Sequence, residues 1–203
     1  MGESIYMKHF FRLVLCSIMA ACTMAFAHND MSADVQFEAL FDSSGFIGIR
    51  NHWTFEEEYS ASSILSVDEN GNGTLDAREI PLLQKLIVDT LVEANYNNYV
   101  LSGAHFLQAK GISDFKASVK SGRLTLDFTV AFSEPAGKDY TMLVIVVYDN
   151  RSKILMDVDT DGAKVKFPKN LDVEFFPDWL KGITMLKAFD SSVRGLFLRY
   201  RKM

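Results

Sequence analysis

Alternating apolar and polar positions are the clearest pattern in the chain, and they predict a β-rich protein. In Ala33–Phe41 every second residue is apolar, and Phe46–Phe55 repeats the pattern after the polar, glycine-containing segment Asp42–Gly45. Successive side chains of a strand point to opposite faces of a sheet, so such alternation is typical of strands with one buried face. We expect these two segments to form a hairpin.

The apolar period then changes to that of a helix. Glu56–Val67 has apolar positions at helical spacing and acidic residues in its first turn, where the helix dipole favours them. After the polar segment Asp68–Glu79, the segment Ile80–Asn95 carries an apolar stripe at Leu83, Ile87, Leu91 and Ala94. A helix–loop–helix insert is therefore expected at about residues 56–95.

Strand-like segments fill most of the remaining chain. They are rich in β-branched and aromatic residues and are separated by glycine and proline turns: Tyr99–Leu107, Phe115–Val119, Leu124–Phe132, Tyr140–Tyr148, Lys153–Val158, Lys164–Phe167 and Leu171–Phe175. Asp178–Phe189 has helical spacing, and Val193–Tyr200 fits either a closing strand or a second helix. The expected fold class is α+β, a mostly antiparallel, sandwich-like β domain with an inserted EF-hand helix–loop–helix.

The N-terminal segment has the features of a secretory signal peptide. Lys8 and Arg12 flank the start of an apolar run over Leu13–Ala21, and the sequence Ala25-Phe26-Ala27 fits the cleavage rule of small residues around a variable one. The apolar run is shorter than the about 20 residues that a membrane-spanning helix needs. We expect cleavage after Ala27, which leaves a single β-rich domain over residues 28–203 in the periplasm or outside the cell.

The cysteines and the charge agree with export. Both cysteines, Cys16 and Cys22, lie in the leader, so the mature chain would have no disulfide framework. Lipid attachment at Cys22 is the alternative, because Met19–Cys22 loosely resembles a bacterial lipobox.

The net charge is −5. An acidic chain without a Lys/Arg cluster is poorly suited to nucleic acid, whose phosphates must be neutralised, so no nucleic-acid partner is expected.

The segment Asp68–Glu79 matches the EF-hand calcium-loop pattern D-x-[DN]-x-[DN]-G-x5-E at every defined position. Calcium is a hard cation that takes about six to eight oxygen ligands. Gly73 permits the sharp turn that the loop needs at its centre. The sequence therefore predicts Ca²⁺ as the bound cofactor. The expected ligands are Asp68, Asn70, Asn72, Thr74 through its carbonyl, Asp76 and Glu79.

The ligand set predicts a weak, solitary site. Only Asp68, Asp76 and Glu79 are charged. Because affinity falls with fewer charged ligands, we expect a dissociation constant on the order of 10⁻⁵–10⁻³ M. The loop lacks a second EF-hand partner, which favours a fixed structural clamp over a cooperative switch. The alternative interpretation is a polar turn between two helices that binds no ion.

Two weaker signals concern metals. The sequence from Asp157 to Gly162 copies the first six positions of a calcium loop, but the twelfth position is Pro168. We expect a hairpin turn there between the strands Lys153–Val158 and Lys164–Phe167, and a second ion site is the alternative.

Cleavage after Ala27 would place a free amine beside the imidazole of His28, a pair suited to copper, zinc or nickel. His28 is therefore a candidate second metal ligand.

His52–Ser60, followed by the calcium loop, resembles a bacterial exported family known as domain of unknown function 1007. The resemblance covers roughly residues 28–175 and is best at Val35–Glu79 and Gly122–Phe128. It implies an exported protein that acts as a periplasmic component of an ABC-type transport system. Members typically begin the mature chain with Ala-His-Pro-His, whereas this chain has Ala27-His28-Asn29-Asp30 and lacks the second histidine.

Two functions are compatible with these observations. The first is an exported calcium-binding protein that is accessory to divalent-metal transport or homeostasis and works with a membrane transporter. The second is a structural or interaction protein of the cell envelope in which calcium is only a stabilising clamp. We do not expect an enzyme, because the sequence has no nucleophile elbow, phosphate loop or triad spacing.

Overall fold

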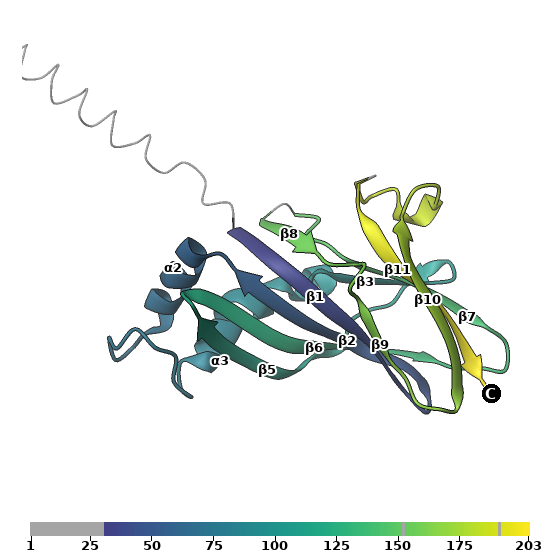
Figure 1. Cartoon of the computed structure of the whole chain (residues 1–203), viewed down its shortest axis with the longest axis horizontal. Helices are drawn as coiled ribbons and strands as arrows, with labels where there is room; N and C mark the ends of the chain where they lie inside the picture. Colours follow the sequence, from purple (N-terminus) through teal and green to yellow (C-terminus); the bar gives the residue numbers. More distant parts are fainter. Residues whose placement is uncertain (1–30, 152, 191) are drawn as a thin grey trace, which may run out of the picture. The chain divides into compact units, whose positions relative to one another are not determined.

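Two β-sheets form the framework of the protein (Figure 1). The computed structural model describes residues 31–151, 153–190 and 192–203, and residues 31–203 form one compact unit. Sheet A contains, in spatial order, β5 (Gly111–Lys120), β6 (Arg123–Pro135), β2 (Gly45–Phe55), β1 (Met31–Asp42) and β8 (Ile154–Val158), with β9 (Lys164–Lys166) also paired to β1. Sheet B contains β10 (Leu171–Trp179), β11 (Arg194–Lys202), β7 (Thr141–Val147), β3 (Asn98–Ser102) and β4 (His105–Phe106).

The hairpin expected at the start of the domain is present. Strands β1 and β2 are antiparallel, with Val35 opposite Trp53. The carboxylate of Asp42 closes the turn by accepting the backbone N–H groups of Ser44 at 2.7 Å and Gly45 at 3.3 Å. A Cβ atom on Gly45 would lie 2.3 Å from the carbonyl oxygen of Glu134, so only glycine allows β6 to approach so closely.

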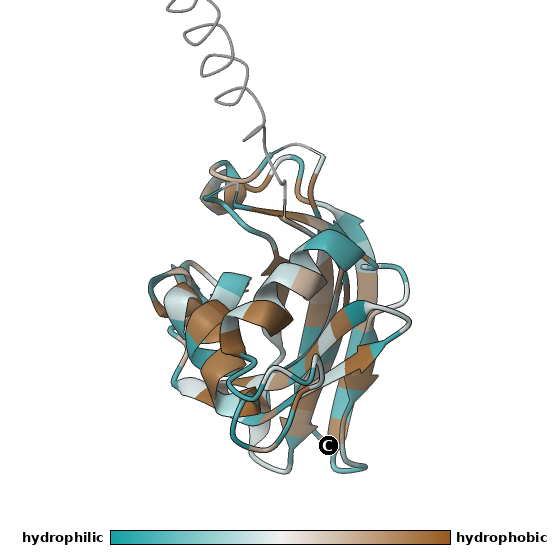
Figure 2. Ribbon diagram, turned by 90° about the vertical axis from the view of Figure 1, so that its left-hand side faces the viewer, coloured by the Kyte–Doolittle hydropathy of each residue, from teal (hydrophilic) through white to brown (hydrophobic). Residues whose placement is uncertain are grey.

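One apolar core joins the two sheets. Buried positions alternate along much of β1 and β6, and Figure 2 shows hydrophobic and hydrophilic residues following one another along the strands of the sheets. Phe41 of sheet A meets Tyr200 of sheet B edge to face, with ring centroids 4.9 Å apart. Such an arrangement is favourable for aromatic pairs. The β-rich character predicted from the alternation is therefore confirmed. The inner face of sheet A is made by Val35, Phe37, Ala39, Phe41, Ile49, Trp53, Phe55, Leu124, Leu126, Phe128 and Val130.

The helical insert differs from the expected one. Helix α2 (Glu57–Val67) is regular, but the second helix is a single α-helical turn, α3 (Ile80–Leu83), followed by a π-helical turn η1 (Gln84–Val88) and a 3₁₀ segment η2 (Asp89–Asn97). The segment ends in three left-handed residues, Asn95 to Asn97, with φ angles of 49°, 56° and 58°. A regular EF-hand helix pair is therefore not supported. Packing of the apolar stripe against the sheets has overridden the continuous helical periodicity.

The expected hairpin around Asp159–Gly162 was wrong. Strands β8 and β9 both pair in parallel with β1, at successive places along it, and not with each other. Val35 lies opposite Val158 of β8, and Glu38 lies opposite Lys164 of β9. The turn thus connects two strands that lie one after the other along the same side of β1. Local alternation cannot distinguish this arrangement from a hairpin, because the partner strand lies far away in the sequence.

The C-terminal predictions were partly wrong. The segment Asp178–Phe189 is not a helix, because β10 continues to Trp179 and only η3 (Thr184–Leu186) is helical. Leu180 and Leu186 from this segment pack on the outer face of sheet B beside Val146. Val193–Tyr200, which fitted either a strand or a helix, is a strand from Arg194 onward: β11 lies between β10 and β7 and pairs with both. Its apolar residues fall on both faces of the strand because both faces of sheet B are covered at this end.

The expected leader, with cleavage after Ala27 and the alternative lipid site at Cys22, lies outside the described residues. Within the described residues, no helix has the length and apolarity needed to cross a membrane.

Candidate metal centre

The polar loop Asp68–Glu79 lies between α2 and α3 and is held by a well-anchored helix. The hydroxyl oxygen of Ser60, on the buried side of α2, accepts the backbone N–H of Leu124 in β6 at 2.8 Å. Arg123 donates from Nε to the carbonyl oxygen of Phe55 at 2.8 Å, and its Nη2 contacts Asp34 at 2.7 Å. These contacts hold the first turn of α2 against sheet A, and the loop begins at the other end of that helix, at Asp68.

Glu79 is the most enclosed residue of the loop, with 1% of its surface exposed. Its Oε2 atom accepts the backbone N–H of Asp76 at 2.9 Å, and its Oε1 atom accepts an N–H from the Asn70 amide at 3.0 Å. The ion pairs found among the described residues do not include Glu79. A buried carboxylate without a cation is unfavourable, because burial removes its hydration without supplying a compensating charge.

Asn70 connects the other polar side chains of the loop. Its amide nitrogen lies 3.0 Å from Glu79 Oε1 and 3.4 Å from Asp76 Oδ2, so an N–H donor stands between two carboxylates. Its Oδ1 atom accepts the backbone N–H of Asn72 at 3.1 Å, and Asp68 Oδ1 accepts the same N–H at 3.1 Å. Five of the six predicted ligands therefore meet in one hydrogen-bonded network, Asn72 through its backbone N–H and the other four through their side chains.

The loop backbone bends as its glycines allow. Gly71 and Gly73 have φ angles of 70° and 69°, a left-handed conformation that glycine adopts without steric cost. The N–H of Gly73 donates to Asp68 Oδ2 at 2.8 Å, which draws the centre of the loop back over its first residue. Asn72 and Thr74 are arranged differently, because Asn72 Oδ1 accepts both the N–H and the hydroxyl of Thr74 at 2.8 Å.

The charge state of Asp76 suits a cation. Hydrogen bonds from the backbone N–H groups of Arg78 and Glu79 lower the pKa of Asp76 below its usual value of 3.8. Hydrogen bonds to the charged form of a carboxyl group stabilise that form. Asp76 therefore carries its negative charge throughout the neutral and mildly acidic range.

The loop fits calcium in ligand chemistry, although its acids are not gathered into one group. Among the described residues, no three or more His, Cys, Asp or Glu side chains lie close enough together to hold a metal ion. The acids Asp68, Asp76 and Glu79 are linked through Asn70 instead. Because all of these side chains offer oxygen atoms, the set matches a hard cation and not zinc. For the acids to share one ion, the Asn70 amide must turn its oxygen inward. The other candidate ligand, His28, lies outside the described residues.

The acidic sequence from Asp157 to Gly162 is used as a turn. Asp159 Oδ1 accepts the N–H of Gly162 at 2.8 Å, and Asp161 is ion-paired with Arg194. A Cβ atom on residue 162 would lie 2.2 Å from a carboxylate oxygen of Asp159. The side chains of this segment therefore support a tight backbone excursion.

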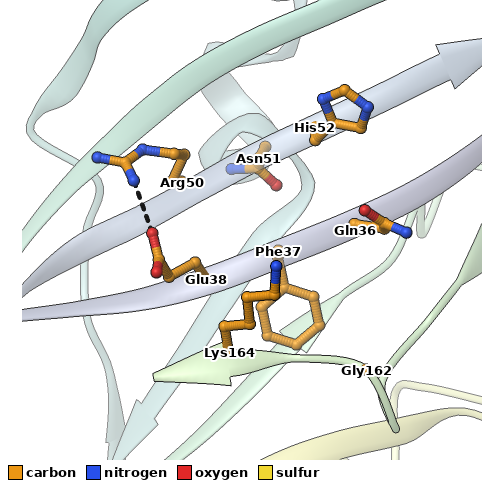
Figure 3. A pocket seen from close by; sticks show the side chains of 8 residues that line it. All are labelled: Gln36, Phe37, Glu38, Arg50, Asn51, His52, Gly162 and Lys164. Carbon is orange, nitrogen blue, oxygen red and sulfur yellow. Dashed lines mark hydrogen bonds and ion pairs between the residues drawn. The ribbon is translucent and has the colours of Figure 1, made fainter. Parts of the chain in front are cut away.

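Sequence reasoning missed a second polar site on the outer face of sheet A. Glu38 contacts Arg50 at 2.6 Å, and His52 Nδ1 lies 2.7 Å from Asp127 Oδ1. Figure 3 shows Arg50, Glu38, His52 and Gln36 around a hollow of about 350 Å³, with Lys164 of β9 opposite them. The alternation of polar residues in β1 and β2 could have indicated this face, but the partners on β6 and β9 depend on register.

Comparison with known proteins agrees with the resemblance noted above. Residues 13–176 match the family described as "Protein of unknown function (DUF1007)". The chain belongs to this family. The DUF1007 match includes the hairpin, the helical insert and the calcium-loop sequence. A curated relative from Spirochaeta aurantia, described as "Uncharacterized 15.5 kDa protein in trpE 3'region", is 29% identical over 110 residues, which cover 50% of this chain and 78% of the relative.

Proposed function

We propose that this DUF1007 protein is an exported, non-enzymatic calcium-binding protein whose ion is held by Asp68–Glu79. The observation that carries the proposal is the enclosed carboxylate of Glu79, which faces the oxygen-bearing side chains of its own loop. An ion there would supply the positive charge that the buried carboxylate lacks. Calcium would neutralise the charge of the loop carboxylates, and the residues of the loop would supply the oxygen ligands and the turn that brings them together. The proposed ligands are Asp68, Asn70, Asn72, Thr74, Asp76 and Glu79.

The position of Glu79 supports a clamp. Glu79 immediately precedes α3, and the chain beyond it buries Leu83, Ile87 and Val88 in the main core. Asp68 immediately follows α2, which is tied to β6 through Ser60. An ion shared between the two ends of the loop would therefore hold the second helical segment in place against the sheets. Binding that occurs only in the folded state stabilises that state.

The wider role that we propose is accessory to divalent-metal transport or homeostasis in the cell envelope, with a membrane transporter or another envelope protein as partner. Its support is the family resemblance and the export signal read from the sequence. The alternative is a structural or interaction protein in which calcium serves only stability. Metal content is the property that separates the two roles.

Calorimetric titration of the purified, naturally processed protein with calcium tests the proposed site. We expect one ion per chain, and we expect the heat of binding to disappear in Glu79→Gln. The matched control is Glu69→Gln, which removes the same charge from an exposed residue of the same loop that is not a proposed ligand. Equal binding by wild type and Glu79→Gln would refute the proposed site.

Elemental analysis separates the two wider roles. Stoichiometric copper, zinc or nickel that is lost in His28→Ala would support metal handling. Calcium as the sole bound metal, unchanged in His28→Ala, would favour the structural role.

A further inference from the structure

A hollow of about 510 Å³ opens on the outer face of sheet A, where β2, β6 and β5 lie side by side. It is next to the hollow in Figure 3, and Arg50 lines both. The register places Arg50 opposite Thr129, and Asp127 opposite Lys116. The side chains that line it are therefore fixed by strand pairing and not by a loop. Its lining residues are Arg50, Asp114, Lys116, Asp127, Phe128 and Thr129.

A bulge in the edge strand shapes this hollow. The pairing of β5 with β6 shifts between Ser113 and Lys116, and Asp114 has a φ angle of 55°. Aspartate is among the few residues other than glycine that adopt this conformation. Bulges change the direction in which side chains point and often occur beside functional sites. Here the bulge places Asp114 and Lys116 at the rim of one hollow without pairing them.

Several polar groups in the hollow lack the partners that their chemistry calls for. The hydroxyl of Thr129 has no hydrogen-bond partner among the residues that the structure describes, although the residue is only 9% exposed. Lys116 is absent from the ion pairs found in the described part of the chain. Within residues 31–151, 153–190 and 192–203, Asp114 accepts the hydroxyl of its neighbour Ser113 at 3.2 Å and no other hydrogen bond. The Thr129 hydroxyl is itself covered by neighbouring atoms, so it is a polar group without a partner beneath the hollow, whereas Arg50, Lys116 and Asp114 are exposed and can be reached by a solute.

Arg50 and Asp127 are each held by one contact and can still form further hydrogen bonds. Glu38 holds one terminal nitrogen of Arg50, which leaves the other guanidinium N–H groups available. His52 occupies one carboxylate oxygen of Asp127, which leaves the second oxygen available. The hollow thus offers cationic donors from Arg50 and Lys116, and anionic acceptors from Asp114 and Asp127.

The geometry points to a binding site for a small zwitterion, a solute that carries a carboxylate and an ammonium group a few bonds apart. The carboxylate binds Arg50 and Lys116, and the ammonium group binds Asp114 and Asp127. A simple anion would meet the two acids, and a simple cation would meet the two bases, so each would be partly repelled. The ring of Phe128 is buried in the core and offers no stacking face, which disfavours sugars and nucleobases.

The test is an NMR titration of the ¹⁵N-labelled, purified protein at a fixed calcium concentration, with glycine, acetate and methylammonium as probes. The site does not depend on the proposed calcium loop, so calcium binding in the same sample is measured separately. We expect saturable shifts of the Thr129 and Lys116 amides with glycine, at a dissociation constant at least about tenfold lower than for acetate or methylammonium. Acetate binding as tightly as glycine would contradict a zwitterion site, as would shifts that do not saturate.

Two variants and a control locate the site. Lys116→Gln and Asp114→Asn, both at exposed positions that line the hollow, should each weaken glycine binding by about three- to tenfold. The control Lys120→Gln removes the same charge from the same strand outside the hollow and should leave binding unchanged. Unchanged glycine affinity in Lys116→Gln would overturn the assignment.

Discussion

Replacing Glu79 with glutamine is expected to remove most of the calcium-dependent stability of this protein. The change keeps the size of a side chain that is 1% exposed and removes its negative charge. The glutamine carbonyl oxygen can still accept the N–H of Asp76, but its amide group meets the amide of Asn70 where the wild-type carboxylate accepted a hydrogen bond. The loss of that bond and the relief of burying a charge act in opposite directions. Without calcium we therefore expect a difference of about 1 kcal/mol or less.

With calcium the two proteins should separate. For a dissociation constant of about 10⁻⁴ M, calcium at about 10 mM is a hundredfold excess and stabilises the wild-type fold by about 2.7 kcal/mol. For a chain of this length such a gain raises Tm by about 5–10 °C. The Glu79→Gln protein should gain little, because one of only three charged ligands is gone. Glu69→Gln, on the same loop, should gain as much as wild type.

The assay is thermal unfolding followed by circular dichroism, in excess chelator and at about 10 mM calcium. Magnesium at the same concentration controls for ionic strength and for nonspecific divalent effects. The reasoning would be refuted by an equal calcium-induced rise of Tm in wild type and Glu79→Gln, or by no rise in wild type. A large loss of stability in chelator alone would show that Glu79 acts through its hydrogen bonds and not through an ion.

Three further predictions follow from contacts away from the loop. Arg123→Gln should lower the free energy of unfolding by about 1–3 kcal/mol in urea denaturation, because Arg123 ties Phe55 and Asp34 together across sheet A. Gly162→Ala should lower it by about 0.5–1.5 kcal/mol by the same measurement, since the added Cβ atom displaces the Asp159 carboxylate, which then loses the N–H of Gly162. Burial raises the pKa of Tyr200 above its usual value of 10.0. The neutral hydroxyl therefore contributes its full stability below pH 10, and this contribution is lost as the pH rises above 10. Tyr200→Phe should reduce this alkaline loss of stability when unfolding is measured as a function of pH.

Local pattern was sufficient for the parts of the fold whose partners are near in sequence. The β1–β2 hairpin could be predicted because alternation and a turn signal lie within one continuous segment. Helix α2 could be predicted because its first-turn acids and apolar spacing agree. The pairing of β8 and β9 with β1 could not, because parallel register is set by contacts between distant segments. Similarly, the helical pattern after Glu79 gave way to a π turn and a 3₁₀ segment that fit the core.

The candidate site was only partly predictable. The motif identified which side chains of the loop bear oxygen, but not that Glu79 would be enclosed or that Asn70 would stand between two carboxylates. Those properties depend on how α2 and α3 pack against the sheets. The hollow beside Thr129 could not be predicted at all, because it needs the register of three strands and the bulge at Asp114.

The most direct test of the central claim is the stoichiometry of calcium binding by isothermal titration. We predict one calcium ion per chain, with a dissociation constant on the order of 10⁻⁵–10⁻³ M, and no binding after Glu79→Gln. The absence of any saturable heat in wild-type protein up to millimolar calcium would contradict the account, and so would saturable binding that Glu79→Gln leaves unchanged.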